Sequence, residues 1–146
     1  MARLLPVLLV IALVSATASA SHASREARPY SVAKVQRAFH SQGLSLWRQH
    51  MFTPARYTRL ASSHPLHVVV FRNEHEAARK VVIVLGSGPP KLRKCHGCVV
   101  IRLRAPRRAV RPWVQETHVG NVAVVYLESK ALDSGVSAAL DALGRS

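Results

Sequence analysis

The sequence predicts an α+β fold, in which about three helices pack on one face of a small, mainly antiparallel sheet. Three observations support this class. Short β-branched runs alternate irregularly with amphipathic segments, a Gly-Asn pair separates two apolar runs, and no strict strand–helix–strand alternation is present. Hydrophobic residues make up 49% of the 146 residues, which supplies one core and excludes a disordered chain.

The first twenty residues have the composition of a secretory signal peptide. Arg3 supplies a positive charge, residues 4–14 are uncharged and apolar, and Ala18-Ser19-Ala20 matches the small-residue cleavage pattern. The alternative is an uncleaved membrane tether, because residues 4–20 could be stretched into a short span of the bilayer. The expected organisation is a signal peptide, a linker and a single α+β domain over residues 1–20, 21–29 and 30–146, respectively.

The mature chain is expected to begin with a helix and then a loop. Ser31 can accept hydrogen bonds from the free N–H groups of the first helical turn, and Gly43 lies where such a helix would end. The helix would bury Val32, Val35 and Phe39. Residues 50–65 contain two prolines and a serine pair without a clear period, so we expect them to loop across the surface.

A strand and a second helix are predicted next. Leu66–Phe71 is rich in β-branched residues, which favours a strand. Asn73 can cap a helix that starts at Glu74, and Glu76 would complete a capping box. Residues 81–85 can be either helix or strand, because they are β-branched and also continue one helical face from Ala77.

Three further strands follow. Val99–Leu103 is a β-branched run, and residues 113–119 and 122–127 flank the pair Gly120-Asn121. The glycine supplies the positive φ that a two-residue turn needs, so these last two strands should pair antiparallel. The chain then closes with a helix that Asp133 or Ser134 is expected to cap. Its apolar face would consist of Val136, Leu140 and Leu143, and it would end at Gly144.

The charge predicts an anionic partner. The sequence contains 21 Lys and Arg against 7 Asp and Glu, which gives a net charge of +14. Such a chain is attracted to anionic lipid, acidic cell-wall polymers or other polyanions. The alternative is a solvated basic surface that only keeps the protein soluble, with the excess of Arg over Lys set by genome base composition. Aromatic residues are only 5%, which disfavours a nucleic-acid module.

An arginine-rich stretch is the predicted binding site. Guanidinium groups bind phosphates and carboxylates bidentately, and a neighbouring tryptophan can lie at a membrane interface or stack on a ring. The alternative is a solvated loop with the tryptophan buried. The candidate binding residues are Arg104, Arg107, Arg108, Arg111 and Trp113.

Cys95 and Cys98 form the sharpest local motif, Cys-His-Gly-Cys. We expect a local disulfide, because an exported protein matures in an oxidising compartment and a β-prone run follows the pair where a redox centre would open a helix. The alternative is thiol–disulfide redox chemistry or metal handling, with His64 and His67, or else His96 or His118, as further ligands. Neither His64 nor His67 has the spacing of a usual zinc site.

The sequence therefore predicts an exported, non-enzymatic domain that binds an anionic surface or ligand. No nucleophile elbow or phosphate-binding loop is complete, and no catalytic residue, resident metal or cofactor is predicted. The alternative function is a thiol-redox or metal-handling protein that uses Cys95 and Cys98.

Overall fold

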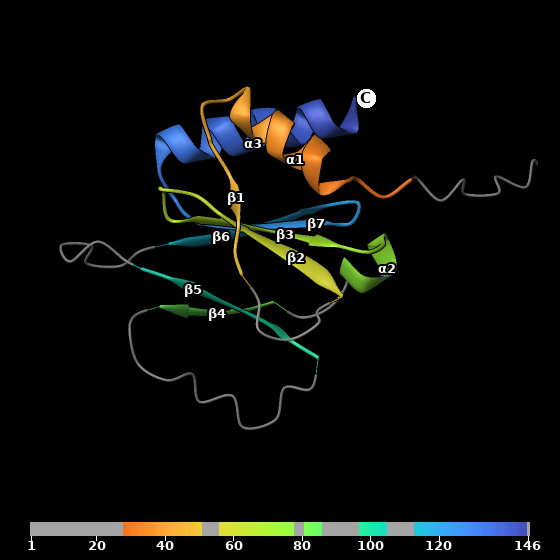
Figure 1. Ribbon diagram of the computed structural model, residues 1–146. Helices are drawn as coiled ribbons and strands as arrows, with labels where there is room; N and C mark the ends of the chain where they lie inside the picture. The colour runs from red at the N-terminus through yellow and green to blue at the C-terminus, as the bar shows by residue number, and fades with distance from the viewer. Residues whose placement is uncertain (1–27, 51–55, 78–80, 86–96, 105–112, 146) are drawn as a thin grey trace, which may run out of the picture.

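The computed structural model describes residues 28–50, 56–77, 81–85, 97–104 and 113–145, and these residues confirm the α+β class. A five-stranded antiparallel sheet has the order β1-β2-β3-β7-β6, and β4 and β5 form a separate parallel pair. Helices α1 and α3 cover one face of the large sheet, and β4 and β5 lie on the opposite face (Figure 1). The elements are α1 (Val32–His40), β1 (Trp47–Arg48), β2 (Tyr57–Ala61), β3 (Leu66–Phe71), α2 (Glu74–Ala77), β4 (Val81–Leu85), β5 (Val99–Leu103), β6 (Val114–Val119), β7 (Val122–Leu127) and α3 (Lys130–Gly144).

The central strands β3 and β7 are buried on both faces, which explains why both are nearly continuous apolar runs. On β3, Val68 and Val70 contact the helix side, whereas Val69 and Phe71 contact the β4–β5 side. The two faces therefore support two separate hydrophobic cores. We call them the helix-side core and the strand-side core.

Helix α1 forms as the sequence predicts. The Ser31 hydroxyl oxygen accepts a hydrogen bond from the Lys34 N–H at 3.3 Å. Val35 and Phe39 are fully buried in the helix-side core, and Gly43 adopts a φ of 76° in the turn that follows the helix. That positive φ is accessible to glycine without strain, so the chain can reverse here toward β1.

Helix α3 starts earlier than predicted. Its N-cap is Ser129, whose hydroxyl oxygen accepts from the Leu132 N–H at 3.2 Å, so the expected cap at Asp133 or Ser134 is wrong. Ser129 follows the end of β7 and is still extended, and Lys130 begins the helix at once. The extra turn buries Leu132 against the helix-side core, and this tertiary contact favours the earlier start.

The expected loop over residues 50–65 is also wrong in part, because it contains β2. This strand pairs antiparallel with β3 along its whole length, from Tyr57 opposite Phe71 to Ala61 opposite His67. The sequence of this strand, YTRLA, has no strong apolar period, and only its last two residues, Leu60 and Ala61, are buried. Pairing with a buried central strand, and not local propensity, makes it a strand.

Helix α2 begins where predicted, and residues 81–85 are a strand. The Glu76 N–H donates to the Asn73 side-chain oxygen at 2.8 Å, which confirms the cap. Ala77 packs in the strand-side core. The segment after it forms β4 in parallel register with β5.

The hairpin of β6 and β7 carries a buried polar clamp. Gly120 has a φ of 52° and Asn121 is 1% exposed in the turn. The Asn121 side-chain amide donates to the carbonyl oxygens of Phe71 (2.7 Å) and Tyr30 (3.0 Å), and its oxygen accepts from the Tyr30 N–H (2.6 Å). This clamp ties the N-terminal end of the described chain to the sheet.

Candidate functional site

The structure places two of the five predicted binding residues. Arg104 is exposed directly after β5, and Trp113 is 72% exposed directly before β6, so the alternative with a buried tryptophan is wrong. The Trp113 carbonyl accepts from the Glu128 N–H at 2.9 Å, which fixes its backbone while the indole is left in solvent. Arg107, Arg108 and Arg111 lie outside the described residues.

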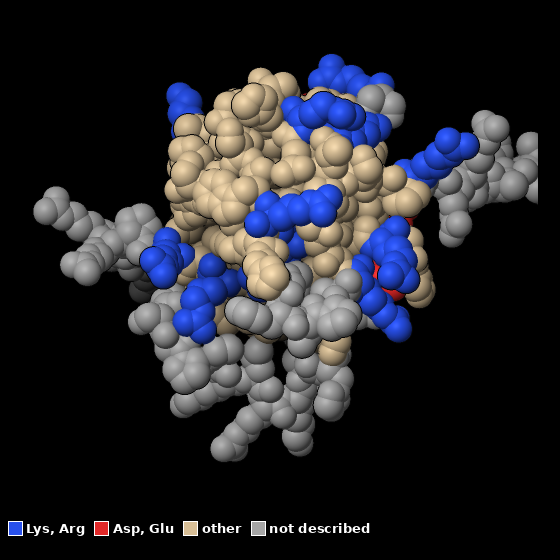
Figure 2. All heavy atoms as spheres, in the orientation of Figure 1, with Lys and Arg blue, Asp and Glu red and all other residues tan. Residues whose placement is uncertain are grey.

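The described cations are distributed over many elements. Figure 2 shows Lys and Arg side chains spread across the viewed face, with little acidic surface between them. Arg56 lies 3.8 Å from the Glu76 carboxylate and can be partly neutralised by it. Within the described ranges, the exposed Lys and Arg residues are Arg28, Arg37, Arg48, Arg56, Arg72, Arg102, Arg104, Lys130 and Arg145.

Cys98 is half-buried and lies directly before β5. Cys95 lies outside the described residues, so the local disulfide stays a prediction, as does its redox or metal-handling alternative. The strand after Cys98 differs from the helix N-terminus that lowers the thiol pKa in CxxC redox centres. Among the described residues, no group of three His, Cys, Asp or Glu side chains could hold a metal ion. Thiol titration together with metal analysis distinguishes a structural disulfide from a redox-active thiol pair and from a metal site.

A polar cluster that the sequence did not predict lies on the strand side of the sheet. Arg59 of β2 and His67 of β3 share this face, and Ala61 is the cross-strand partner of both His67 and Trp47 of β1. The Arg59 Nε and His67 Nδ1 atoms are buried without a hydrogen-bond partner. Burial, and secondarily the nearby Arg59 charge, lower the pKa of His67, against the opposing effect of a hydrogen bond with the Arg102 backbone.

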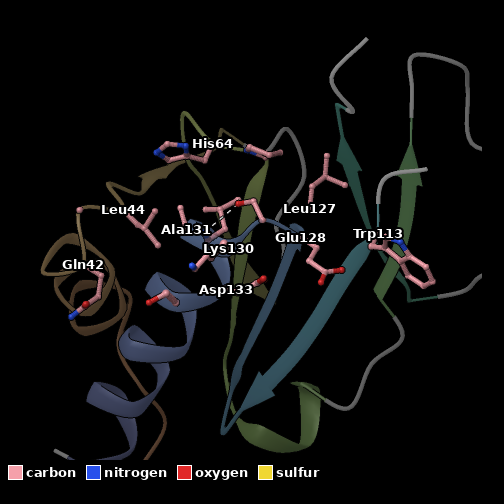
Figure 3. A pocket seen from close by; sticks show the side chains of 14 residues that line it. Gln42, Leu44, His64, Trp113, Leu127, Glu128, Lys130, Ala131 and Asp133 are labelled. Carbon is pink, nitrogen blue, oxygen red and sulfur yellow. Dashed lines mark hydrogen bonds between the residues drawn. The ribbon is translucent and has the colours of Figure 1, made fainter. Parts of the chain in front are cut away.

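An open groove of about 1420 Å³ lies where α3 begins. It extends from the turn after α1 to the start of β6, with Gln42 and Leu44 at one end, Glu128 and Lys130 between, and Trp113 at the other end (Figure 3). Its wall combines apolar side chains with carboxylate, amide, ammonium and imidazole groups. The lining residues are Gln42, Gly43, Leu44, His64, Pro65, Trp113, Leu127, Glu128, Ser129, Lys130, Ala131, Leu132, Asp133 and Ser134.

Two carboxylates of this groove lie near the Tyr126 hydroxyl. Burial, a hydrogen bond to Asp133 and the charges of Asp133 and Glu128 raise the pKa of Tyr126. The Asp133 Oδ1 atom is buried and has no hydrogen-bond partner, so this carboxylate can still accept a hydrogen bond.

Sequence reasoning missed both the groove and the cluster around His67. The groove unites residues from four distant stretches, at 42–44, 64–65, 113 and 127–134. None of these stretches contains a binding motif, and of the lining residues only Trp113 was predicted to contact an anionic ligand. Alternation in Tyr57–Ala61 could have placed Arg59 on a sheet face, but its partner strand was needed to show which face.

No protein family, curated protein or solved structure matches this chain. Among the helices of the described residues, none has the length and apolarity to cross a bilayer.

Proposed function

We propose that this chain is an exported, non-enzymatic domain that attaches to an extended polyanion outside the cytoplasm through its basic surface. The spread of exposed Arg and Lys over α1, β1, β5 and α3 supports the proposal. A distributed surface suits a partner with repeating charges, because many weak contacts add up along it. A single anion would be better matched by cations that converge on one pocket.

Anionic lipid is the polyanion that the exposed tryptophans favour. Trp47 is 49% exposed and Trp113 is 72% exposed, and indole rings prefer the interface between lipid and water. Trp47 lies on the edge strand β1, and Trp113 precedes the opposite edge strand β6. They do not form the continuous stacking platform on which proteins bind single-stranded nucleic acid.

Vesicle co-sedimentation tests this function. We expect the protein to bind phosphatidylcholine vesicles that contain phosphatidylglycerol, to bind pure phosphatidylcholine weakly, and to dissociate as salt is raised. Equal binding to both vesicle types, or salt-independent failure to bind the anionic vesicles, polyphosphate or duplex DNA, would contradict the proposal. Tighter binding to DNA than to anionic vesicles would show that nucleic acid, and not anionic lipid, is the preferred polyanion.

Single substitutions test whether the charge acts in a distributed way. Arg48→Gln, Arg104→Gln and Arg145→Gln should each weaken vesicle binding by a similar factor, about fivefold, since a basic residue near an anionic surface contributes about 1 kcal/mol. Gln115→Ser, at an exposed neutral position on β6, is the matched control and should leave binding unchanged. Loss of all binding in one arginine variant alone would instead show a local site.

A further inference from the structure

The groove at the start of α3 has a different chemistry from the basic surface. Its charged lining consists of Glu128, Asp133 and Lys130, and the positive end of the α3 dipole faces the same region. A polyanion would meet two carboxylates there, and an oligocation would meet Lys130 and the helix end. The mixture therefore disfavours a highly charged ligand of either sign.

We propose that this groove binds a neutral oligosaccharide. Sugar hydroxyls both donate and accept hydrogen bonds, and the groove offers partners of both kinds. Glu128 and Asp133 supply acceptors, and the Gln42 amide and the Lys130 ammonium supply donors. A chain of neutral sugar rings can satisfy both sets without an unpaired charge.

The Asp133 carboxylate supplies the sharpest contact for a hydroxyl. The Asp133 side chain lies next to the Tyr126 hydroxyl, and its buried Oδ1 atom has no hydrogen-bond partner. Leaving a buried acceptor without a donor is unfavourable, so a rotation of the Asp133 side chain that presents Oδ1 to a ligand O–H gains a hydrogen bond without breaking one.

Trp113 and the shape of the groove favour several sugar rings over one. Figure 3 places Trp113 at one end and Gln42 at the other, with Glu128 and Lys130 between them. The C–H face of a pyranose ring can pack on the exposed indole, which is apolar and rigid. The volume of about 1420 Å³ exceeds that of a usual small-molecule pocket, and the groove is open along its length.

Trp113 fluorescence provides the test. The sequence has two tryptophans, so a Trp47→Phe variant leaves Trp113 as the single indole. This variant is titrated separately with chitotriose, cellotriose and maltotriose, and the affected residues are mapped by amide NMR. We expect at least one trisaccharide to give a saturable emission change, with shifted amides at residues 42–44 and 128–134, and with an affinity that is insensitive to salt.

Variants of the groove sharpen the result. Glu128→Gln and Trp113→Ala, both at exposed positions, should each weaken the NMR-detected affinity about tenfold, as expected for loss of a charged hydrogen bond or an aromatic contact. Asp133→Asn should weaken it by a similar factor. Glu74→Gln, an exposed acid on α2, is the matched control and should bind like the parent protein.

Three outcomes would overturn the proposal: no saturable change with any trisaccharide, equal changes with glycerol, or saturation by free arginine or polyphosphate alone. The groove proposal does not rest on polyanion binding. Trisaccharide binding is measured without vesicles and vesicle binding without sugar, so either one can fail while the other stands.

Discussion

The two faces of the large sheet are built differently. On the helix side, α1 and α3 cover an apolar core in which Val35, Phe39 and Leu60 are fully buried. On the strand side, the two-stranded β4–β5 pair covers the sheet, and Arg59 and His67 lie on the same face with buried polar atoms that lack partners. Among the described residues the helix-side core contains 15 buried residues and the strand-side core 10, so we expect truncations on the helix side to cost more stability.

Matched leucine truncations give the largest expected effect. Leu60 in the helix-side core and Leu103 in the strand-side core are both fully buried. We expect Leu60→Ala to cost about 4 kcal/mol of unfolding free energy and Leu103→Ala about 2–3 kcal/mol, because the β4–β5 pair can move toward the cavity more easily than two packed helices. Urea unfolding measures both. An equal or larger cost for Leu103→Ala would refute the proposed difference.

The clamp at Asn121 ties the N-terminal end of the described chain to β3 and should give an intermediate effect. Its side chain makes three hydrogen bonds, to Tyr30 and Phe71. Asn121→Ala leaves these backbone groups without partners and should cost about 2–3 kcal/mol. Gln115→Ser on the exposed part of β6 is the control. If thermal and urea unfolding both show no loss of stability in Asn121→Ala, the clamp does not stabilise the fold and the prediction is wrong.

The smallest expected effect is on the pH dependence of stability, and it comes from His67 on the strand side of the sheet. The folded-state pKa of His67 lies below its ordinary value of 6.5, chiefly because of burial. The unfolded chain therefore binds a proton first as pH falls, so stability is fully present above about pH 6.5 and decreases below it, down to the folded pKa. His67→Gln should reduce the loss of urea stability between neutral and mildly acidic pH, and the exposed His40→Gln should not. An identical pH dependence in His67→Gln would contradict this assignment.

The sequence predicted the elements whose own residues determine them. Leu66–Phe71 and Val122–Leu127 are buried on both faces, and their β-branched runs show it. Gly120 was recognised because the turn needs a positive φ, and Asn73 because the first turn of a helix needs a side-chain acceptor. Element boundaries were less predictable where packing decides them, as at Ser129.

Features that depend on distant pairing could not be predicted. Tyr57–Ala61 is a strand because β3 lies beside it, and Val81–Leu85 is a strand because β5 does. The groove needs Gln42, Trp113 and Asp133 to meet across the fold, and the unpaired Oδ1 atom of Asp133 is visible only in three dimensions. The pattern of a single sequence does not show which distant residues lie close together in the fold.

The position of the Asn121 clamp has a mechanical consequence. A pull on the chain upstream of Tyr30 first loads the paired hydrogen bonds between Tyr30 and Asn121, before any force reaches α1. Asn121 transmits that tension to the ends of β3 and β7, which bond to each other in the middle of the sheet. A domain held at its N-terminal side would therefore resist being peeled open from its first helix.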